Sequence, residues 1–122
     1  MKKILIVEDE EMLLKILSKK LQINGFGVDL ARDGKEALDK LNYFKPDLIL
    51  LDIVMPVMDG ITFLKKIKDT EYKNVPIIIL TNLNEGKNVE EAIENGASDY
   101  LIKVEYPLEE LIQRIKVRLA IT

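Results

Sequence analysis

Charged and hydroxyl side chains follow several apolar segments of this sequence, at the point where each segment ends. The apolar segments are Lys3–Val7, Leu48–Leu51, Val75–Leu80 and Tyr100–Ile102. The side chains that follow them are Glu8, Asp9, Asp52, Thr81 and Lys103. If these segments are parallel strands, their carboxyl ends lie along one edge of a sheet, where such folds bind ligands. The sequence therefore predicts a single site at that edge.

The carboxylates of this predicted site point to a bound cation. Glu8 and Asp9 alone are equally well explained as acids that stabilise the positive end of the following helix. Asp52 changes this interpretation, because the strands that precede Glu8 and Asp52 are expected to be neighbours. Converging carboxylates repel one another, and Lys103 offsets only part of their charge. Mg²⁺ fits one to three carboxylates together with retained waters and a phosphate oxygen, so it is the expected cofactor.

The residue types that are missing exclude several kinds of chemistry. The chain has no cysteine and no histidine. Disulfides, cysteine or histidine zinc sites and histidine-dependent nucleophilic catalysis are therefore excluded. A metal here must be bound by oxygen, as Mg²⁺ or Ca²⁺ are, and a covalent nucleophile must be Asp, Glu, Ser, Thr, Lys or Tyr.

Strand-type and helix-type segments alternate along the whole chain. The expected strands are Lys3–Val7, Phe26–Leu30, Asp47–Leu51, Val75–Leu80 and Asp99–Ile102. The apolar residues that mark the first helix are Met12, Leu13, Ile16, Leu17 and Leu21. A second helix is expected from Asp33, as its N-cap, to about Tyr43. Two further helices are expected around Ile61–Ile67 and around Val89–Ile93. A last helix is expected to have Pro107 as its first residue. This (βα)₅ pattern predicts an α/β fold with a doubly wound parallel sheet and helices on both faces.

Length and charge limit the classes of function. The chain has 122 residues, 48% of them hydrophobic, and a net charge of −3. We expect a single domain over residues 1–122 with no output domain in this chain. The dispersed basic residues do not predict a nucleic-acid surface. No segment approaches the roughly 20 apolar residues that a membrane span needs, so a cytoplasmic location is expected.

The segment around Asp52 resembles a known family. Leu-Leu-Asp-Ile-Val-Met-Pro-Val-Met-Asp-Gly, residues 50–60, is similar to the corresponding stretch of the receiver domains of bacterial two-component response regulators. Other matching positions, in chain order, are Glu8, Asp9, Thr81, Tyr100 and Lys103. The resemblance covers the whole chain and implies the chemotaxis-type receiver fold, with strand order 2-1-3-4-5.

The resemblance also implies a phosphorylation mechanism. Asp52 is the expected phosphoacceptor, and a sensor histidine kinase or a phosphotransfer protein is the expected donor. Mg²⁺ would be held by the carboxylates of Glu8, Asp9 and Asp52 and by the backbone carbonyl of Val54. Lys103 and Thr81 would contact the phosphoryl group.

Further expectations concern the response to phosphorylation. The backbone N–H groups expected to cradle the phosphoryl group are those of Ile53, Val54 and Asn82. Thr81 and Tyr100 are the expected switch pair. The domain would catalyse its own phosphorylation and a slow self-dephosphorylation, yet act as a signalling switch rather than an enzyme. A phosphorylation-dependent homodimer is a further possible state, and the downstream partner or output domain is not indicated.

One position departs from the family pattern. Val104 stands where the family usually has a proline after the lysine. Because a cis bond before a residue other than proline costs about 3–4 kcal/mol, we predict a trans Lys103–Val104 bond. This change affects the aim of Lys103, so a receiver-like interaction module that works without phosphorylation is an open alternative.

Two other functions are weighed against the receiver interpretation. An aspartyl-phosphate phosphatase of the haloacid-dehalogenase type needs a second aspartate two residues after the nucleophile, where this chain has Val54. A flavodoxin-like carrier would share the strand order, but Glu8 and Asp9 would repel the phosphate of its cofactor. Both are therefore less favoured than a phosphoacceptor domain.

Overall fold

Parallel strands form one central sheet in the computed structural model, which describes residues 1–82, 86–103 and 107–120. The strands are β1 (Lys3–Val7), β2 (Gly27–Ala31), β3 (Leu48–Leu51), β4 (Ile77–Thr81) and β5 (Asp99–Ile102). They pair in the order β2-β1-β3-β4-β5, and every neighbouring pair is parallel. The predicted topology is confirmed.

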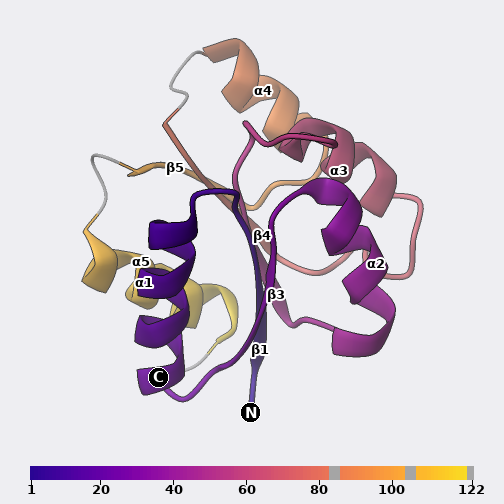
Figure 1. The fold of residues 1–122 in the computed structure, drawn as a ribbon. Coiled ribbons are helices and arrows are strands. Elements are labelled where there is room, and N and C mark those ends of the chain that lie inside the picture. Colours follow the sequence, from indigo (N-terminus) through magenta and orange to yellow (C-terminus); the bar gives the residue numbers. More distant parts are fainter. Residues whose placement is uncertain (83–85, 104–106, 121–122) are drawn as a thin grey trace.

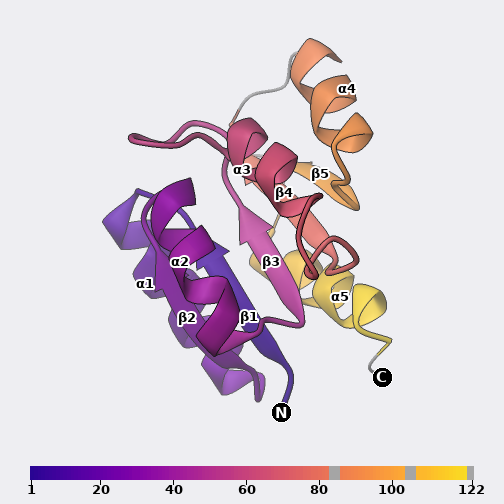
Figure 2. The ribbon, with the colours of Figure 1, turned by 90° about the vertical axis from the view of Figure 1, so that its right-hand side faces the viewer.

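Helices cover both faces of this sheet, as Figures 1 and 2 show. They are α1 (Glu11–Ile23), α2 (Gly34–Phe44), α3 (Gly60–Ile67), α4 (Gly86–Glu94) and α5 (Leu108–Arg118). One apolar core joins α1 and α5 to one face of the sheet, and a second core joins α2, α3 and α4 to the other face. The doubly wound arrangement is therefore built on two separate cores.

Alternation of side chains along the central strands explains these two cores. In β1, Leu5 and Val7 pack in the core with α2, α3 and α4. Ile4 and Ile6 pack in the core with α1 and α5. A central strand that is covered on both faces needs apolar residues at every position, which is why its sequence is a continuous apolar run.

Some element boundaries and faces differ from the sequence prediction. Strand β4 begins at Ile77 because Pro76 has no N–H to donate to the sheet, although its carbonyl accepts a hydrogen bond from the N–H of Ile49. Helix α5 begins at Leu108, and Pro107 is its N-cap rather than its first helical residue, with an extended ψ of 146°.

The buried face of α1 also differs from the expected one. Leu14, Leu17 and Leu21 are buried, whereas Met12 is 67% exposed and Ile16 is 48% exposed. Apolar residues occupy most of the circumference of this helix, so the sequence pattern did not identify which of the possible stripes faces the sheet.

Helix α3 begins in contact with the backbone of Asp52. The N–H of Gly60 donates to the carbonyl of Ile53 at 2.9 Å. A Cβ atom placed on Gly60 would lie 2.3 Å from the carbonyl oxygen of Asp52. Only a residue without a side chain fits there, and this close approach fixes the backbone that carries Asp52.

Replacing Gly60 by alanine is expected to destabilise the fold by about 2 kcal/mol, because either α3 or the end of β3 must move. Urea denaturation followed by circular dichroism measures this change. Gly27→Ala is the matched control: its Cβ would first meet the end of the flexible Met1 side chain, at 3.0 Å. Equal midpoints for the two variants would show that the contact at Gly60 is relieved without cost.

Candidate functional site

The side chains predicted from the strand ends lie together in the structure. They line a cleft of about 350 Å³ at the carboxyl edge of the sheet. Its lining residues are Glu8, Asp9, Glu10, Asp52, Val54, Thr81, Asn82 and Lys103. The predicted convergence of three carboxylates, a threonine and a lysine is therefore confirmed.

Backbone pairing places the acids at this edge. The N–H of Asp52 donates to the carbonyl of Val7 at 3.0 Å, and the N–H of Glu8 donates to the carbonyl of Ala31 at 2.9 Å. Each bond continues the parallel ladder one residue beyond the regular strand pairing. Glu8 and Asp52 are thus held at the ends of adjacent strands.

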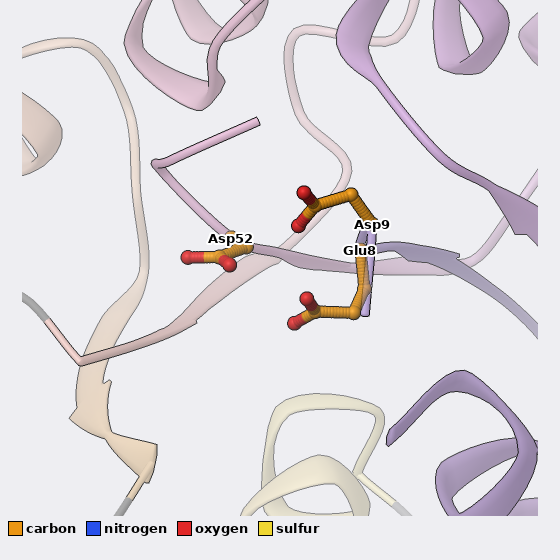
Figure 3. A group of neighbouring side chains, drawn as sticks. All are labelled: Glu8, Asp9 and Asp52. Carbon is orange, nitrogen blue, oxygen red and sulfur yellow. The ribbon is translucent and has the colours of Figure 1, made fainter. Parts of the chain in front are cut away.

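The three carboxylates face one another closely enough to share a cation. One oxygen each of Glu8, Asp9 and Asp52 lies within 4.8 Å of the other two (Figure 3). Glu8 and Asp52 are buried, whereas Asp9 is exposed. This set offers only oxygen ligands and leaves an open side, which fits a hard divalent cation that keeps part of its water shell.

The ammonium group of Lys103 lies between two of these acids. Its Nζ lies 2.6 Å from Oε1 of Glu8 and 3.0 Å from Oδ2 of Asp52. The lysine side chain is 12% exposed, and those of Glu8 and Asp52 are 4% and 7% exposed. The lysine therefore forms a buried ion pair with both acids, and the predicted approach of Lys103 to Asp52 is confirmed.

Burial and this ion pair shift the pKa values of Glu8 and Lys103. Burial raises the pKa of Glu8 above its usual value, and the hydrogen bonds from Lys103 and from the Glu10 backbone oppose that shift only in part. Burial would lower the pKa of Lys103, but hydrogen bonds to Glu8 and Asp52 and their charges outweigh it, so the pKa is raised. Lys103 therefore stays an ammonium group at neutral pH.

Backbone N–H groups donate to the oxygen of each buried carboxylate that does not contact Lys103. The N–H of Ile53 donates to Oδ1 of Asp52 at 2.7 Å, and the N–H of Glu10 donates to Oε2 of Glu8 at 3.0 Å. The contribution of Glu10 was missed by the sequence analysis, which considered only side chains at this turn. Its position as the N-cap of α1 is the signal that could have indicated a free backbone donor.

Thr81 and Tyr100 lie on the same face of the sheet. Thr81 is the last residue of β4 and is 1% exposed, and Tyr100 is half-buried on β5. Tyr100 pairs in register with Ile79, two residues before Thr81. The two residues are therefore diagonal neighbours, as a switch pair requires, although a rearrangement between them stays a prediction.

Two predictions at this site have different outcomes. Val54 and Asn82 are exposed and line the cleft, and the donation of their backbone N–H groups to a phosphoryl group stays a prediction. The predicted trans bond between Lys103 and Val104 lies outside the described residues.

Among the described helices, none combines the length and the apolar character that a membrane span needs.

Comparisons with known proteins agree on one family. A family model described as the response regulator receiver domain matches residues 4–116. The response regulator MprA of Mycolicibacterium vanbaalenii is 36% identical over 117 residues, which are 96% of this chain and 50% of that protein. The chain thus spans about half the length of the curated relatives it matches.

Solved structures with the same fold are also similar in sequence. A two-component response regulator from Clostridium difficile superposes with a TM-score of 0.91 at 35% identity, covering 98% of this chain and 97% of the other. The BeF3-activated N-terminal receiver domain of Klebsiella pneumoniae RstA superposes with a TM-score of 0.89 at 32% identity, covering 97% of this chain and 98% of the other.

Proposed function

The chain belongs to the response regulator receiver domain family, and we propose that it accepts a phosphoryl group on Asp52 from a phosphohistidine of a sensor kinase or phosphotransfer protein. The observation that carries this proposal is the setting of the Asp52 carboxylate. It is held by the Ile53 N–H on one oxygen and by the Lys103 ammonium on the other, and it opens into the cleft.

The chemistry follows from these contacts. A carboxylate oxygen of Asp52 forms a bond to phosphorus as the phosphorus–nitrogen bond of the donor breaks, and the leaving imidazole keeps the bonding electron pair. Lys103 lies beside the attacking group and is positioned to contact a phosphoryl oxygen. The Ile53, Val54 and Asn82 backbones are the further proposed donors, in the way that backbone N–H groups bind anions elsewhere.

The acidic group fits Mg²⁺ as the cofactor. Glu8, Asp9 and Asp52 would hold it, together with the carbonyl of Val54. The bound cation would offset the negative charge that develops on the transferred phosphoryl oxygens. Asp9 is the exposed member of the group and therefore the one that an entering hydrated cation meets first.

Phosphorylation is proposed to change the surface of the domain rather than to turn over a substrate. Thr81 would move toward the phosphoryl group, and Tyr100, on the same sheet face, would turn inward. We propose a signalling switch in the cytoplasm that binds a downstream protein or controls an output domain, with a phosphorylation-dependent homodimer as one form. Val54, 60% exposed and apolar, cannot orient a hydrolytic water, so slow self-dephosphorylation is part of this proposal.

Intact-mass measurement after incubation with acetyl phosphate tests the proposal. With Mg²⁺, we expect a gain of one phosphoryl group that hydroxylamine removes, as it does from an acyl phosphate. With EDTA in place of Mg²⁺, we expect no adduct, because the acids would then oppose the approach of the phosphoryl oxygens. The same samples, followed over time after removal of acetyl phosphate, give the rate of self-dephosphorylation.

Absence of the adduct under both conditions, and also with a purified kinase as donor, would favour an interaction module that works without phosphorylation. A hydroxylamine-resistant adduct would instead place the phosphoryl group on a hydroxyl side chain such as that of Thr81.

A further inference from the structure

Strand β2 lies at one edge of the sheet. It pairs with β1 on one side, and no described strand pairs with its other side (Figure 2). The unpaired side of an edge strand presents backbone N–H and carbonyl groups that another strand can bind. Of the five residues of β2 only the last, Ala31, is buried, so the outer side of this strand is accessible.

Alternation along β2 identifies the residues whose backbone groups point outward. The N–H of Gly27 and the carbonyl of Ala31 bond to the residues that flank β1, each at 2.9 Å. In a parallel ladder only every second residue bonds to a given neighbouring strand, so the odd-numbered residues of β2 face β1. The N–H and carbonyl groups of Val28 and Leu30 therefore point away from the sheet.

Two charged side chains occupy both outward groups of Leu30. Its N–H donates to Oδ1 of Asp29 at 2.8 Å, and its carbonyl accepts from the ammonium group of Lys40. The same ammonium group lies 3.1 Å from Oδ1 of Asp29 and 3.6 Å from Oε1 of Glu36. Lys40 belongs to α2, and its side chain is only 21% exposed, so it lies against the strand rather than extending into water.

A second copy of β2 has the geometry to pair with this edge. Edge strands of two copies related by a two-fold axis run antiparallel, and with the axis at Asp29, Val28 of one copy faces Leu30 of the other. Each such pair would exchange two backbone hydrogen bonds, which need the outward N–H and carbonyl of Leu30. The Asp29 carboxylates of the two copies would also face each other, and like charges directly opposite are unfavourable.

We propose that the outer edge of β2 is a pairing surface for a second copy of this chain, and that Asp29 and Lys40 keep it closed. This surface lies outside the cleft and needs no phosphoryl group, so it goes beyond the proposed function. The two contacts with the Leu30 backbone carry the inference, because an ion pair at the surface has little effect by itself.

The test is a double substitution, Asp29→Val with Lys40→Met, in the unphosphorylated chain. It frees both outward groups of Leu30 and removes the facing carboxylates. Sedimentation velocity at increasing protein concentration is expected to give a dimer dissociation constant at least about tenfold below that of the native chain. The matched control is Asp39→Val with Lys35→Met, which makes the same changes at exposed positions of α2 and is expected to leave association unchanged.

Adding Val28→Pro to the double variant tests whether association uses this edge. Proline has no N–H to donate, and it is tolerated in an edge strand where the N–H faces solvent. The fold is therefore expected to be kept, while association returns to the native level. Amide hydrogen exchange gives a second readout: the Val28 N–H is expected to exchange more slowly as the double variant is concentrated, and at a constant rate in the native chain.

A double variant that stays monomeric at every concentration would overturn the inference. Association that the control shares, or that Val28→Pro leaves intact, would overturn it as well. Asp29→Asn with Lys40→Met keeps the shape of residue 29, removes both charges and frees the carbonyl of Leu30. This milder pair is expected to associate more tightly than the native chain, and it decides the outcome if the first double variant does not fold.

Discussion

Replacing Asp52 by asparagine is expected to abolish phosphorylation completely. The amide is a far weaker nucleophile than a carboxylate and cannot give an acyl phosphate. The substitution keeps the shape of the side chain, so the Ile53 N–H can still donate to the amide oxygen, while the amide nitrogen then takes the place of the oxygen that accepts from Lys103. Intact mass after incubation with acetyl phosphate and Mg²⁺ measures the result, and peptide mapping identifies the modified residue in the native chain.

Asp39→Asn is the control for this substitution, because Asp39 is an exposed aspartate on α2. It is expected to gain the phosphoryl group at the native rate. An unchanged adduct on Asp52→Asn would mean that another side chain is the acceptor, and the position found by mapping would replace Asp52 in the mechanism.

Replacing Lys103 by methionine is expected to lower the free energy of unfolding at pH 7 by about 3 kcal/mol, because it leaves two buried carboxylates without their shared cation. Glu8 and Asp52 are 4% and 7% exposed, so water compensates them poorly. Urea denaturation at pH 7 measures the loss. Added Mg²⁺ is expected to restore part of it, since a bound cation replaces the missing positive charge.

The cost of Lys103→Met is expected to depend on pH with a definite sign. Burial already raises the pKa of Glu8, and removing the lysine removes an interaction that lowers it. The folded variant then holds a proton that the unfolded chain releases, so its stability falls as pH rises through the folded pKa. The difference from the native chain should therefore be small near pH 4 and larger at pH 7.

Lys20→Met is the control, because Lys20 pairs with Glu109 on the surface, where the two side chains are 33% and 76% exposed. Its unfolding midpoint is expected to match that of the native chain at each pH. A Lys103→Met cost that is equal at low and neutral pH would mean that lost packing, rather than uncompensated charge, explains the effect.

The sequence predicted the fold and the members of the site because both depend on local patterns. Continuous apolar runs indicated covered parallel strands, and the positions directly after them identified Glu8, Asp52 and Lys103 without knowledge of distances. The resemblance around Asp52 then assigned an expected role to each of these residues. The topology and the convergence at one edge are both confirmed.

What the sequence did not predict depends on how elements pack in space. The contact of Glu8 with Lys103 joins the residue that follows β1 to the residue that follows β5, and it requires the side-chain directions that only the assembled sheet fixes. The buried stripe of α1, with Leu14 in place of Ile16, depends on the rotation of a helix that is apolar on most sides. Both features depend on contacts between residues far apart in the sequence, which local periodicity does not determine.

The close approach of Gly60 to the carbonyl of Asp52 couples the start of α3 to the backbone of the site. The backbone of Asp52 lies so close to Gly60 that no side chain fits at the start of α3. A displacement of the Asp52 backbone toward α3 would therefore require the start of that helix to move as well. A glycine that takes no part in the chemistry thus ties the start of α3 to the residue proposed to accept the phosphoryl group.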